Sequence, residues 1–242
     1  MITIGLLISL YHFTLEYSPL FHCLHTFFKK LPSYKNFKES DKGIIVRAFL
    51  LGILTLFGWY LYKKPSTIQN FGIYLSILSF FHFSEYFFTA ISNPQNLGIR
   101  SFLIDHSTEY HVAALAAVFE YFICRWLFPG LKQSSTGLSF FNCLGVLICF
   151  GGETFRKLAM LTCGTNFNHL VEYRDREDHE LVTEGVYGIS RHPSYVGWAY
   201  WAVGTQLILG NFLCLFGYAY VTFWFFSERI PDEEKTLIGK EF

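Results

Sequence analysis

The stretch that decides the fold is "LVTEGVYGISRHPSYVGW", residues 181–198. It begins polar, holds His192-Pro193 near its middle and continues directly into an apolar segment. A proline disfavours the helical region for the residue before it, so His192 is expected to lie outside a helix. Pro193 suits the first helical position, because it has no N–H to be left without a partner there. The stretch therefore predicts a helix that starts at Pro193 and a polar loop that leads into it.

The composition on either side of this stretch predicts an integral membrane protein. Of the 242 residues, 52% are hydrophobic and only 16% are charged, and the charges are bunched between long apolar windows. A helix needs about 20 mostly apolar residues to cross a bilayer. We therefore predict an all-α polytopic membrane protein with about seven transmembrane helices. The predicted spans are residues 2–28, 44–62, 68–91, 108–128, 138–158, 194–209 and 212–227.

The distribution of Lys and Arg predicts how these spans are oriented. With the spans as above, 15 of the 19 basic residues fall on one side of the membrane and only Lys63, Lys64, Arg125 and Lys132 on the other. Basic loops favour the cytosolic face. The loop 159–193 and the C-terminus are therefore predicted to be cytosolic and near enough to build one site. Only Gly210-Asn211 separates the last two spans, so they should form a tight hairpin.

The start of the predicted helix could hold a small molecule. Free amides at Ser194, Tyr195 and onward would face the cytosolic surface, and a helix N-terminus favours anions. Gly185 and Gly188 suit tight turns that bring backbone close to a ligand. The alternative is a plain interfacial turn with belt aromatics. The residues alone leave both interpretations open.

Two further groups of residues could carry chemistry. In "SERIPDEEKTL", residues 227–237, Arg229 and Glu233 share a face if the segment is helical. They could form an ordinary surface ion pair or part of a site, and Pro231 should kink the helix or open a new one. The histidines of the same region (His169, His179 and His192) lack the i,i+4 spacing and the Cys or Asp partners of a metal site, so no metal is expected.

Five segments together resemble the isoprenylcysteine carboxyl methyltransferases, membrane enzymes that methylate the C-terminal carboxylate of prenylated proteins. The segments are "SILSFFHFSEYFFTAISNP" (76–94), "SFLIDHSTEYHVAAL" (101–115), "GETFRKLAMLTCGTNFNH" (152–169), "HELVTEGVYGISRHPSYVGW" (179–198) and "ERIPDEEKTLI" (228–238). The R-H-P-x-Y-x-G motif alone is shared with phospholipid methyltransferases and some sterol reductases. The combination of all five makes the resemblance specific.

The resemblance implies a cofactor, a substrate and their ligands. It implies S-adenosylmethionine as cofactor, prenylated CAAX-protein C-termini as partners, a multi-pass location in the endoplasmic reticulum membrane, and no nucleic acid or metal. Arg229 would bind the substrate carboxylate and act in catalysis. The implied cofactor contacts are Glu172, His179, Glu180, Leu181, Val182, Tyr187, His192, Pro193, Ser194, Tyr195 and Glu233. On this basis we expect residues 1–158 to form the membrane core with substrate access, and residues 159–242 to form the catalytic region with the helical hairpin 194–227.

The chain departs from the family pattern at both ends. Family members usually begin with one more span, which gives eight, and continue into a G-x-x-Y-x-x-Y segment that packs over the site. This chain stops at Phe242, which predicts a shortened form of such an enzyme.

Two rival functions stay open at this point. One is a sterol or lipid reductase or a phospholipid methyltransferase relative, although residues 179–198 offer only Arg191 for the phosphates of a nicotinamide cofactor. The other is a transporter or an inactive relative in which Glu85 and Glu120 are pathway carboxylates. Helix-to-helix hydrogen bonding by these two residues is the interpretation we favour.

Overall fold

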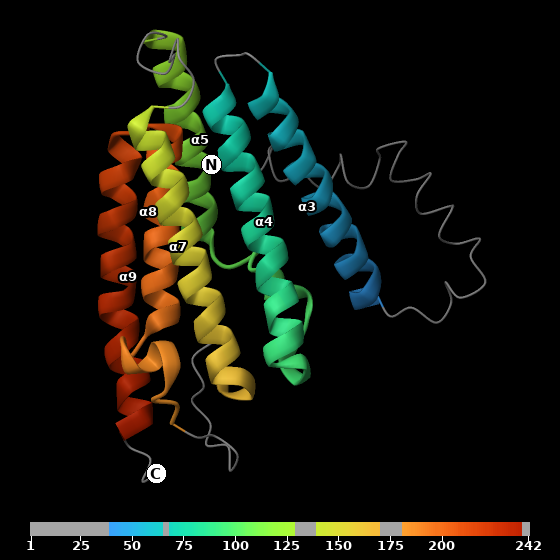
Figure 1. Cartoon of the computed structure of the whole chain (residues 1–242), viewed down its shortest axis with the longest axis vertical. Helices are drawn as coiled ribbons and strands as arrows, with labels where there is room; N and C mark the ends of the chain where they lie inside the picture. The colour runs from blue at the N-terminus through green and yellow to red at the C-terminus, as the bar shows by residue number, and fades with distance from the viewer. Residues whose placement is uncertain (1–38, 65–67, 129–138, 170–180, 239–242) are drawn as a thin grey trace, which may run out of the picture. The chain divides into compact units, whose positions relative to one another are not determined.

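The structure, a computed structural model, describes residues 39–64, 68–128, 139–169 and 181–238. The chain divides into two compact units, residues 1–45 and 46–242, and the site described below lies in the second. The described residues contain helices and no strands (Figure 1). The long helices are α3 (Glu39–Lys63), α4 (Gln69–Ser92), α5 (Thr108–Leu127), α7 (Phe140–Cys163), α8 (Pro193–Leu209) and α9 (Leu213–Ile238). Short 3-10 helices lie in the connections: η2 (Pro94–Asn96), η3 (Ile99–Phe102), η4 (Gly164–Asn166) and η5 (Gly185–Gly188).

The predicted all-α class is confirmed, and six of the seven predicted spans coincide with a long helix. The span at 2–28 lies outside the described residues. The predicted boundary at 158 is wrong as a helix end, because α7 continues to Cys163. Pro231 does not open a new helix, because α9 runs through it to Ile238. The prediction for the opening stretch is confirmed: His192 is non-helical with φ −127° and ψ 63°, and Pro193 is the first residue of α8.

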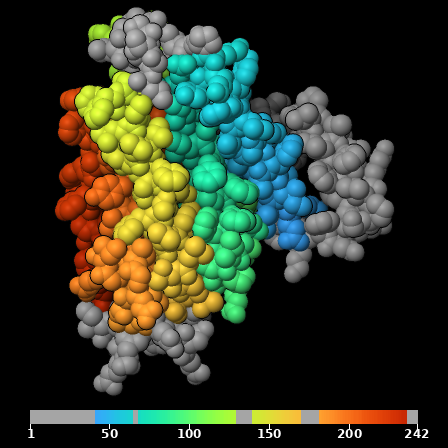
Figure 2. Space-filling model, viewed as in Figure 1, coloured from blue at the N-terminus to red at the C-terminus, as the bar shows by residue number. Residues whose placement is uncertain are grey.

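α7 and α8 form the most extensive helix–helix contact among the described helices, and α4 packs against both. Figures 1 and 2 show α4 beside α7. Small residues at the crossing of α7 and α8 let the two backbones approach closely, as is usual for helices packed in lipid. A Cβ placed on Gly152 would lie 2.5 Å from the carbonyl oxygen of Gly197, and one on Gly145 would lie 2.8 Å from that of Gly204. The two helices therefore meet along a line of glycines, which fixes the side chains of one helix relative to the other.

Buried polar groups hold the predicted α8–α9 hairpin together. Gly210 ends α8 in the left-handed conformation, and Asn142 of α7 donates hydrogen bonds to the last carbonyls of α8, those of Leu207 and Ile208. The carboxylate of Glu120 on α5 accepts from the first amides of α9, those of Leu213 and Cys214, at 2.8 and 2.6 Å. These partners satisfy backbone groups that a helix leaves without intrahelical hydrogen bonds at its ends.

The outer faces of the helices are apolar. Large side chains such as Trp126, Phe150 and Phe223 are 74 to 80% exposed, and many other exposed aromatic and aliphatic residues surround them. Such a surface is typical of a protein in contact with lipid. Judged by length and hydropathy alone, one described helix qualifies as a membrane span, residues Asp41–Lys63. The number of spans stays a prediction.

Candidate active site

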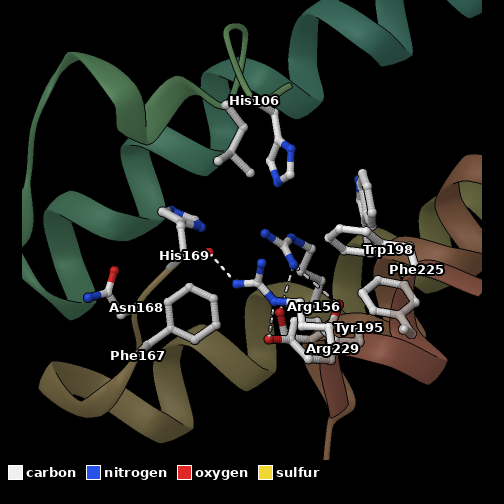
Figure 3. A pocket seen from close by; sticks show the side chains of 12 residues that line it. His106, Arg156, Phe167, Asn168, His169, Tyr195, Trp198, Phe225 and Arg229 are labelled. Atoms are coloured by element: carbon white, nitrogen blue, oxygen red, sulfur yellow. Dashed lines mark hydrogen bonds between the residues drawn. The ribbon is translucent and has the colours of Figure 1, made fainter. Parts of the chain in front are cut away.

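A cavity lies where the first turn of α8, the C-terminal half of α9 and two loops come together (Figure 3). It contains about 380 Å³ of empty space, part of it open to solvent. Besides α7, α8 and α9, the loop between η3 and α5 and the loop after η4 supply its walls. The lining residues are Leu103, His106, Arg156, Phe167, Asn168, His169, Ser194, Tyr195, Trp198, Phe225, Phe226 and Arg229.

Arg229 on α9 reaches the cavity with most of its donors still available. Its Nε–H donates to the Tyr195 hydroxyl and an Nη2–H to the backbone oxygen of His169, both at 2.9 Å (Figure 3). A guanidinium carries five N–H groups. Three of the five therefore have no hydrogen-bond partner among the described residues. Arg229 is a cation held at two points, with donors left for an anion.

Arg156 on α7 is the second guanidinium of the cavity wall, and it is buried. Its Nε and Nη2 donate to the two carboxylate oxygens of Glu85 on α4 at 2.6 and 2.9 Å. Its Nη1 donates to the hydroxyl of Ser194 at 2.6 Å and to the Ser194 backbone oxygen at 3.3 Å. These bonds leave a single Nη2–H of Arg156 without a partner in the described part of the chain.

Aromatic side chains form another part of the cavity wall, and the Arg229 guanidinium lies 5.7 Å from the centroid of the Phe225 ring. The ring of His106 stacks on Trp198 at 5.8 Å between centroids and meets Phe225 edge-on at 6.3 Å. Trp198 also packs edge-on against Phe226 at 5.6 Å. The indole N–H of Trp198 is buried and has no hydrogen-bond partner among the residues described. One cavity thus combines a cationic wall with an aromatic wall.

A second cluster of charged groups adjoins the cavity beyond Tyr195. His192 stacks on the Tyr195 ring at 5.6 Å, and its Nδ1 and Nε2 lie 3.5 and 3.2 Å from the carboxylates of Glu233 and Glu234. Arg191 contacts Glu234 at 2.9 Å. Glu233 also accepts a hydrogen bond from the Tyr195 hydroxyl. Arg229, Tyr195 and Glu233 thus form one hydrogen-bonded chain from the cavity to this cluster.

The pKa values of the groups outside the helical spans follow from these contacts. Burial alone would lower the pKa of His192, but the hydrogen bonds and charges of Glu233 and Glu234 outweigh burial and raise it. Burial would raise the pKa of Glu233, but His192 and Tyr195 lower it. The pKa of His106 is lowered by burial and by the charges of Arg229 and Arg156. These shifts favour the His192–Glu233 ion pair and keep the cavity free of further positive charge near neutral pH.

Comparison with known proteins identifies the family. Residues 144–239 match the model of the isoprenylcysteine carboxyl methyltransferase family. The chain is 47% identical over 202 residues to a protein-S-isoprenylcysteine O-methyltransferase of Xenopus laevis, and this match covers 84% of the chain and 69% of the relative. The chain belongs to the isoprenylcysteine carboxyl methyltransferase family.

Two more comparisons agree with the family assignment. The human relative of the same name is 44% identical, with 82% of this chain and 70% of the relative covered. The solved structure of a eukaryotic intramembrane Ras methyltransferase of this family matches with a TM-score of 0.81 and 38% identity, covering 99% of this chain and 86% of the other. The chain is thus an intramembrane methyltransferase by family, which favours that interpretation over the reductase and transporter alternatives.

The residues implied by the family motifs fall into three groups in the structure. Ser194, Tyr195 and Arg229 line the cavity, and His192, Pro193 and Glu233 lie next to it. The second group lies earlier in the polar loop. Tyr187 is in η5 and its hydroxyl bonds to Cys163, whereas Leu181, next to Val182, is 53% exposed. Glu172, His179 and Glu180 lie outside the described residues.

The start of α8 offers fewer free amides than expected. The N–H groups of Tyr195 and Val196 both donate to the backbone oxygen of His192, at 3.1 and 3.2 Å. The amide of Ser194 alone, in the first turn of α8 as described, makes no backbone hydrogen bond. The tight first turn accounts for the difference, because its i−3 bond occupies a donor that an ideal α-helix would leave open.

Sequence reasoning missed part of the cationic wall and most of the aromatic wall. Arg156, His106 and Phe225 line the cavity but were assigned no role. A charged residue within a predicted span is itself a signal of function, so Arg156 could have been found. His106 lies in the loop between η3 and α5, which is distant in sequence from α8 and α9. No local sequence pattern therefore predicts that His106 lines the cavity.

The two intramembrane carboxylates that suggested a transport pathway have structural partners. Glu120 binds the first amides of α9, and Glu85 binds Arg156. Helix-to-helix hydrogen bonding by both residues is therefore confirmed. The part of the chain that the structure describes contains no cluster of three or more His, Cys, Asp or Glu side chains arranged to hold a metal ion.

Proposed function

We propose that this chain transfers a methyl group from S-adenosylmethionine to the C-terminal α-carboxylate of a farnesyl- or geranylgeranyl-cysteine on CAAX-type proteins. The observation that carries the proposal is a single cavity lined both by the donors of Arg229 and by a group of aromatic rings that begins at Phe225. An S-prenylcysteine has the same two parts, a single carboxylate and an apolar chain. The relatives' shared name, protein-S-isoprenylcysteine O-methyltransferase, supports the same reaction.

The residues of the cavity would act by binding and orientation. An α-carboxyl titrates near 3.5, so the nucleophilic oxygen is already ionised at neutral pH and needs no general base. Arg229 would hold the carboxylate through its open N–H groups, and Arg156 would add its one available donor. Two oriented cations also offset the cost of bringing the carboxylate out of water. Their main contribution is to align one carboxylate oxygen with the methyl donor.

The residues beyond Tyr195 fit a cationic cofactor. When bound, S-adenosylmethionine supplies an electrophilic methyl group on a sulfonium, beside an amino group and a carboxylate. Glu233 is an ionised carboxylate beside the cavity that could hold the amino group, and the faces of Tyr187 and Tyr195 could lie against the sulfonium. The Ser194 amide at the start of α8 could bind the carboxylate. We assign Leu181, Val182, His192 and Pro193 to the same site, and we extend it to Glu172, His179 and Glu180.

Tyr195 lies between the two proposed sites. Its hydroxyl accepts from Arg229 on the cavity side and donates to Glu233 on the cofactor side. One side chain thus connects the residue that would hold the nucleophile with the residue that would hold the donor. Such a connection suits a reaction in which positioning supplies most of the rate.

The proposal includes an orientation in the membrane. The loop 159–193 and the C-terminus would face the cytosol from the endoplasmic reticulum membrane, which the bias of basic residues supports. The prenyl chain of the substrate already lies in the bilayer. The aromatic wall of Trp198, Phe225 and Phe226 would receive it from the membrane side.

The test is methyl transfer by the purified chain in lipid nanodiscs. Methyl-labelled S-adenosylmethionine and an N-acyl S-farnesylcysteine should give a labelled methyl ester, recognised by the release of labelled methanol in base. The matched substrate with a C-terminal carboxamide should take up no label. Binding of the cofactor without transfer to the acid would refute the proposed substrate.

A further inference from the structure

Four buried polar residues of α4 and its C-terminal cap share one face of a mostly apolar helix. His82, Glu85, Thr89 and Asn93 are spaced by three and four residues, which places them on one side, and each is between 0 and 6% exposed. None of them lines the cavity. We refer to them as the α4 polar stripe. Its burial in an apolar helix is costly unless each member has partners.

Each member of the α4 polar stripe bonds to a residue that lines the cavity or lies next to its lining. His82 Nδ1 donates to the Phe102 carbonyl, just before the loop that carries Leu103 and His106. The Thr89 hydroxyl lies 3.0 Å from His169 Nε2. Asn93 donates to the carbonyls of Thr165 and Phe167, next to His169. The stripe thus braces both loops of the cavity from behind.

Glu85 is the charged member of the α4 polar stripe, and it holds Arg156. Its side chain is fully buried and contacts Arg156 at 2.6 Å through one oxygen and 2.9 Å through the other, in the bidentate geometry that fixes a guanidinium in its plane. It also contacts Lys157, which in turn lies 3.4 Å from Glu153. Other orientations of the Arg156 side chain are limited, because its remaining nitrogen, Nη1, donates to the Ser194 hydroxyl.

The charges around Glu85 balance. The two carboxylates Glu85 and Glu153 oppose the two cations Arg156 and Lys157, so this buried set has no net charge when all four are ionised. Without Glu85, the guanidiniums of Arg156 and Arg229 would lie in one low-dielectric cavity with less compensation and would repel each other. Glu85 therefore determines both the orientation of Arg156 and the charge that it presents to an anion.

We propose that Glu85 is a positioning residue of the methyl-transfer reaction, which fixes the guanidinium of Arg156 at the cavity wall so that it can bind the substrate carboxylate together with Arg229. This inference rests on the proposed function. It assigns a role to an α4 residue that does not line the cavity and that acts through Arg156. The same carboxylate also contacts Lys157 and lies 3.7 Å from His169 Nδ1.

The test compares Glu85→Gln with Glu120→Gln in the full chain. Both are buried intramembrane carboxylates, but Glu120 binds the start of α9 rather than a cavity residue. Glu85→Gln should lower kcat/KM for an N-acyl S-farnesylcysteine about tenfold or more, with unchanged affinity for S-adenosylmethionine. Glu120→Gln should lower the melting temperature but leave kcat/KM per cofactor-binding molecule unchanged. Equal kcat/KM in Glu85→Gln and wild type would overturn the inference.

A double-mutant cycle distinguishes positioning from general support of the fold. If Glu85 acts through Arg156, adding Glu85→Gln to Arg156→Lys should change kcat/KM by less than about twofold, because the oriented guanidinium is already lost. Additive losses would contradict this. If Glu85→Gln does not fold, Glu85→Asp takes its place. The aspartate keeps the charge but is too short for the bidentate contact with Arg156. Glu85→Asp should therefore reduce kcat/KM with no change in cofactor affinity. An inactive wild-type chain would refute the proposed function itself, whereas an active wild type with a fully active Glu85 variant refutes only the role of Glu85.

Discussion

Replacing Gly152 with alanine should separate α7 from α8 and disturb the cavity one turn away. A Cβ at this position would lie 2.5 Å from the Gly197 carbonyl oxygen and 2.7 Å from the Trp201 amide nitrogen. Both are backbone atoms of α8, so no side-chain rotation can relieve the contact. Carbon contacts normally lie at 3.5 Å or more, so the helices must move apart by about 1 Å.

The size of the effect follows from two opposing contributions. Overpacking of a close contact typically costs about 1–3 kcal/mol. Alanine in place of glycine within a helix offsets about 1 kcal/mol of this. The net loss should be up to about 2 kcal/mol, which corresponds to a melting temperature lower by up to roughly 8 °C for a chain of this size. Because Arg156 lies one turn beyond Gly152 on the same helix, we also expect methyl transfer to fall.

Gly151→Ala provides the matched control. A Cβ on Gly151 meets nothing within 4 Å, so this variant gains helix propensity without a clash. Thermal unfolding in detergent should rank Gly151→Ala at or above wild type and Gly152→Ala clearly below it. Methyl-transfer rates measured on the folded fraction should follow the same order. A Gly152→Ala protein as stable as the Gly151→Ala protein would refute the packing argument.

Three other predictions follow from the cavity and its surroundings. Arg229→Lys keeps the charge but loses the planar guanidinium fork, so it should lower turnover with little change in S-adenosylmethionine affinity. Glu233→Gln should instead weaken cofactor binding roughly tenfold to a hundredfold, with affinity measured by calorimetry and turnover by initial rates. Equal loss of cofactor affinity in the two variants would contradict this division of roles. The pKa of His192 is raised above 6.5, so its ion pair with Glu233 stabilises the fold fully below about pH 6.5 and is lost as the pH rises through the raised pKa. Between pH 6.5 and 9 the cofactor-free wild type should therefore lose up to about 1 kcal/mol relative to His192→Gln in thermal unfolding, and parallel curves would refute the pairing. A cysteine introduced near Asp178 should react with an impermeant reagent only from the cytosolic side of sealed vesicles, and luminal labelling would reverse the proposed topology.

The sequence was sufficient to predict the helices, because local chemistry determines them. Pro193 begins α8 where the rule for residues before proline places it, and Gly210 ends that helix in the left-handed conformation that favours glycine. Arg229 and Glu233 were expected on one helical face, and both contact Tyr195. The end of α7 was missed, because residues 159–163 contain no strong stop signal before Gly164.

The cavity was harder to predict, because its walls come from segments that are distant in the sequence. Arg156 faces the cavity only because Glu85 and Ser194, on two other helices, hold it there. His106 reaches the cavity from a loop that also depends on Arg47, which donates to Ile99 and contacts Asp105 at 2.7 Å. Such long-range contacts leave no period or spacing in a single sequence. The family motifs identified residues of the proposed cofactor site, and the structure added the walls of the proposed substrate site.

The most direct test of the central claim is equilibrium binding of two matched ligands, an N-acyl S-farnesylcysteine with a free carboxylate and its carboxamide. Both have the same lipid chain, so a difference in affinity reports on the carboxylate alone. We predict that the wild-type chain binds the acid roughly tenfold to a hundredfold more tightly, the range expected for charge-assisted hydrogen bonds, and that Arg229→Ala loses most of this preference while still binding the amide. Equal affinity of the wild-type chain for the two ligands, or an undiminished preference for the acid in Arg229→Ala, would contradict the assignment of Arg229 to the substrate carboxylate.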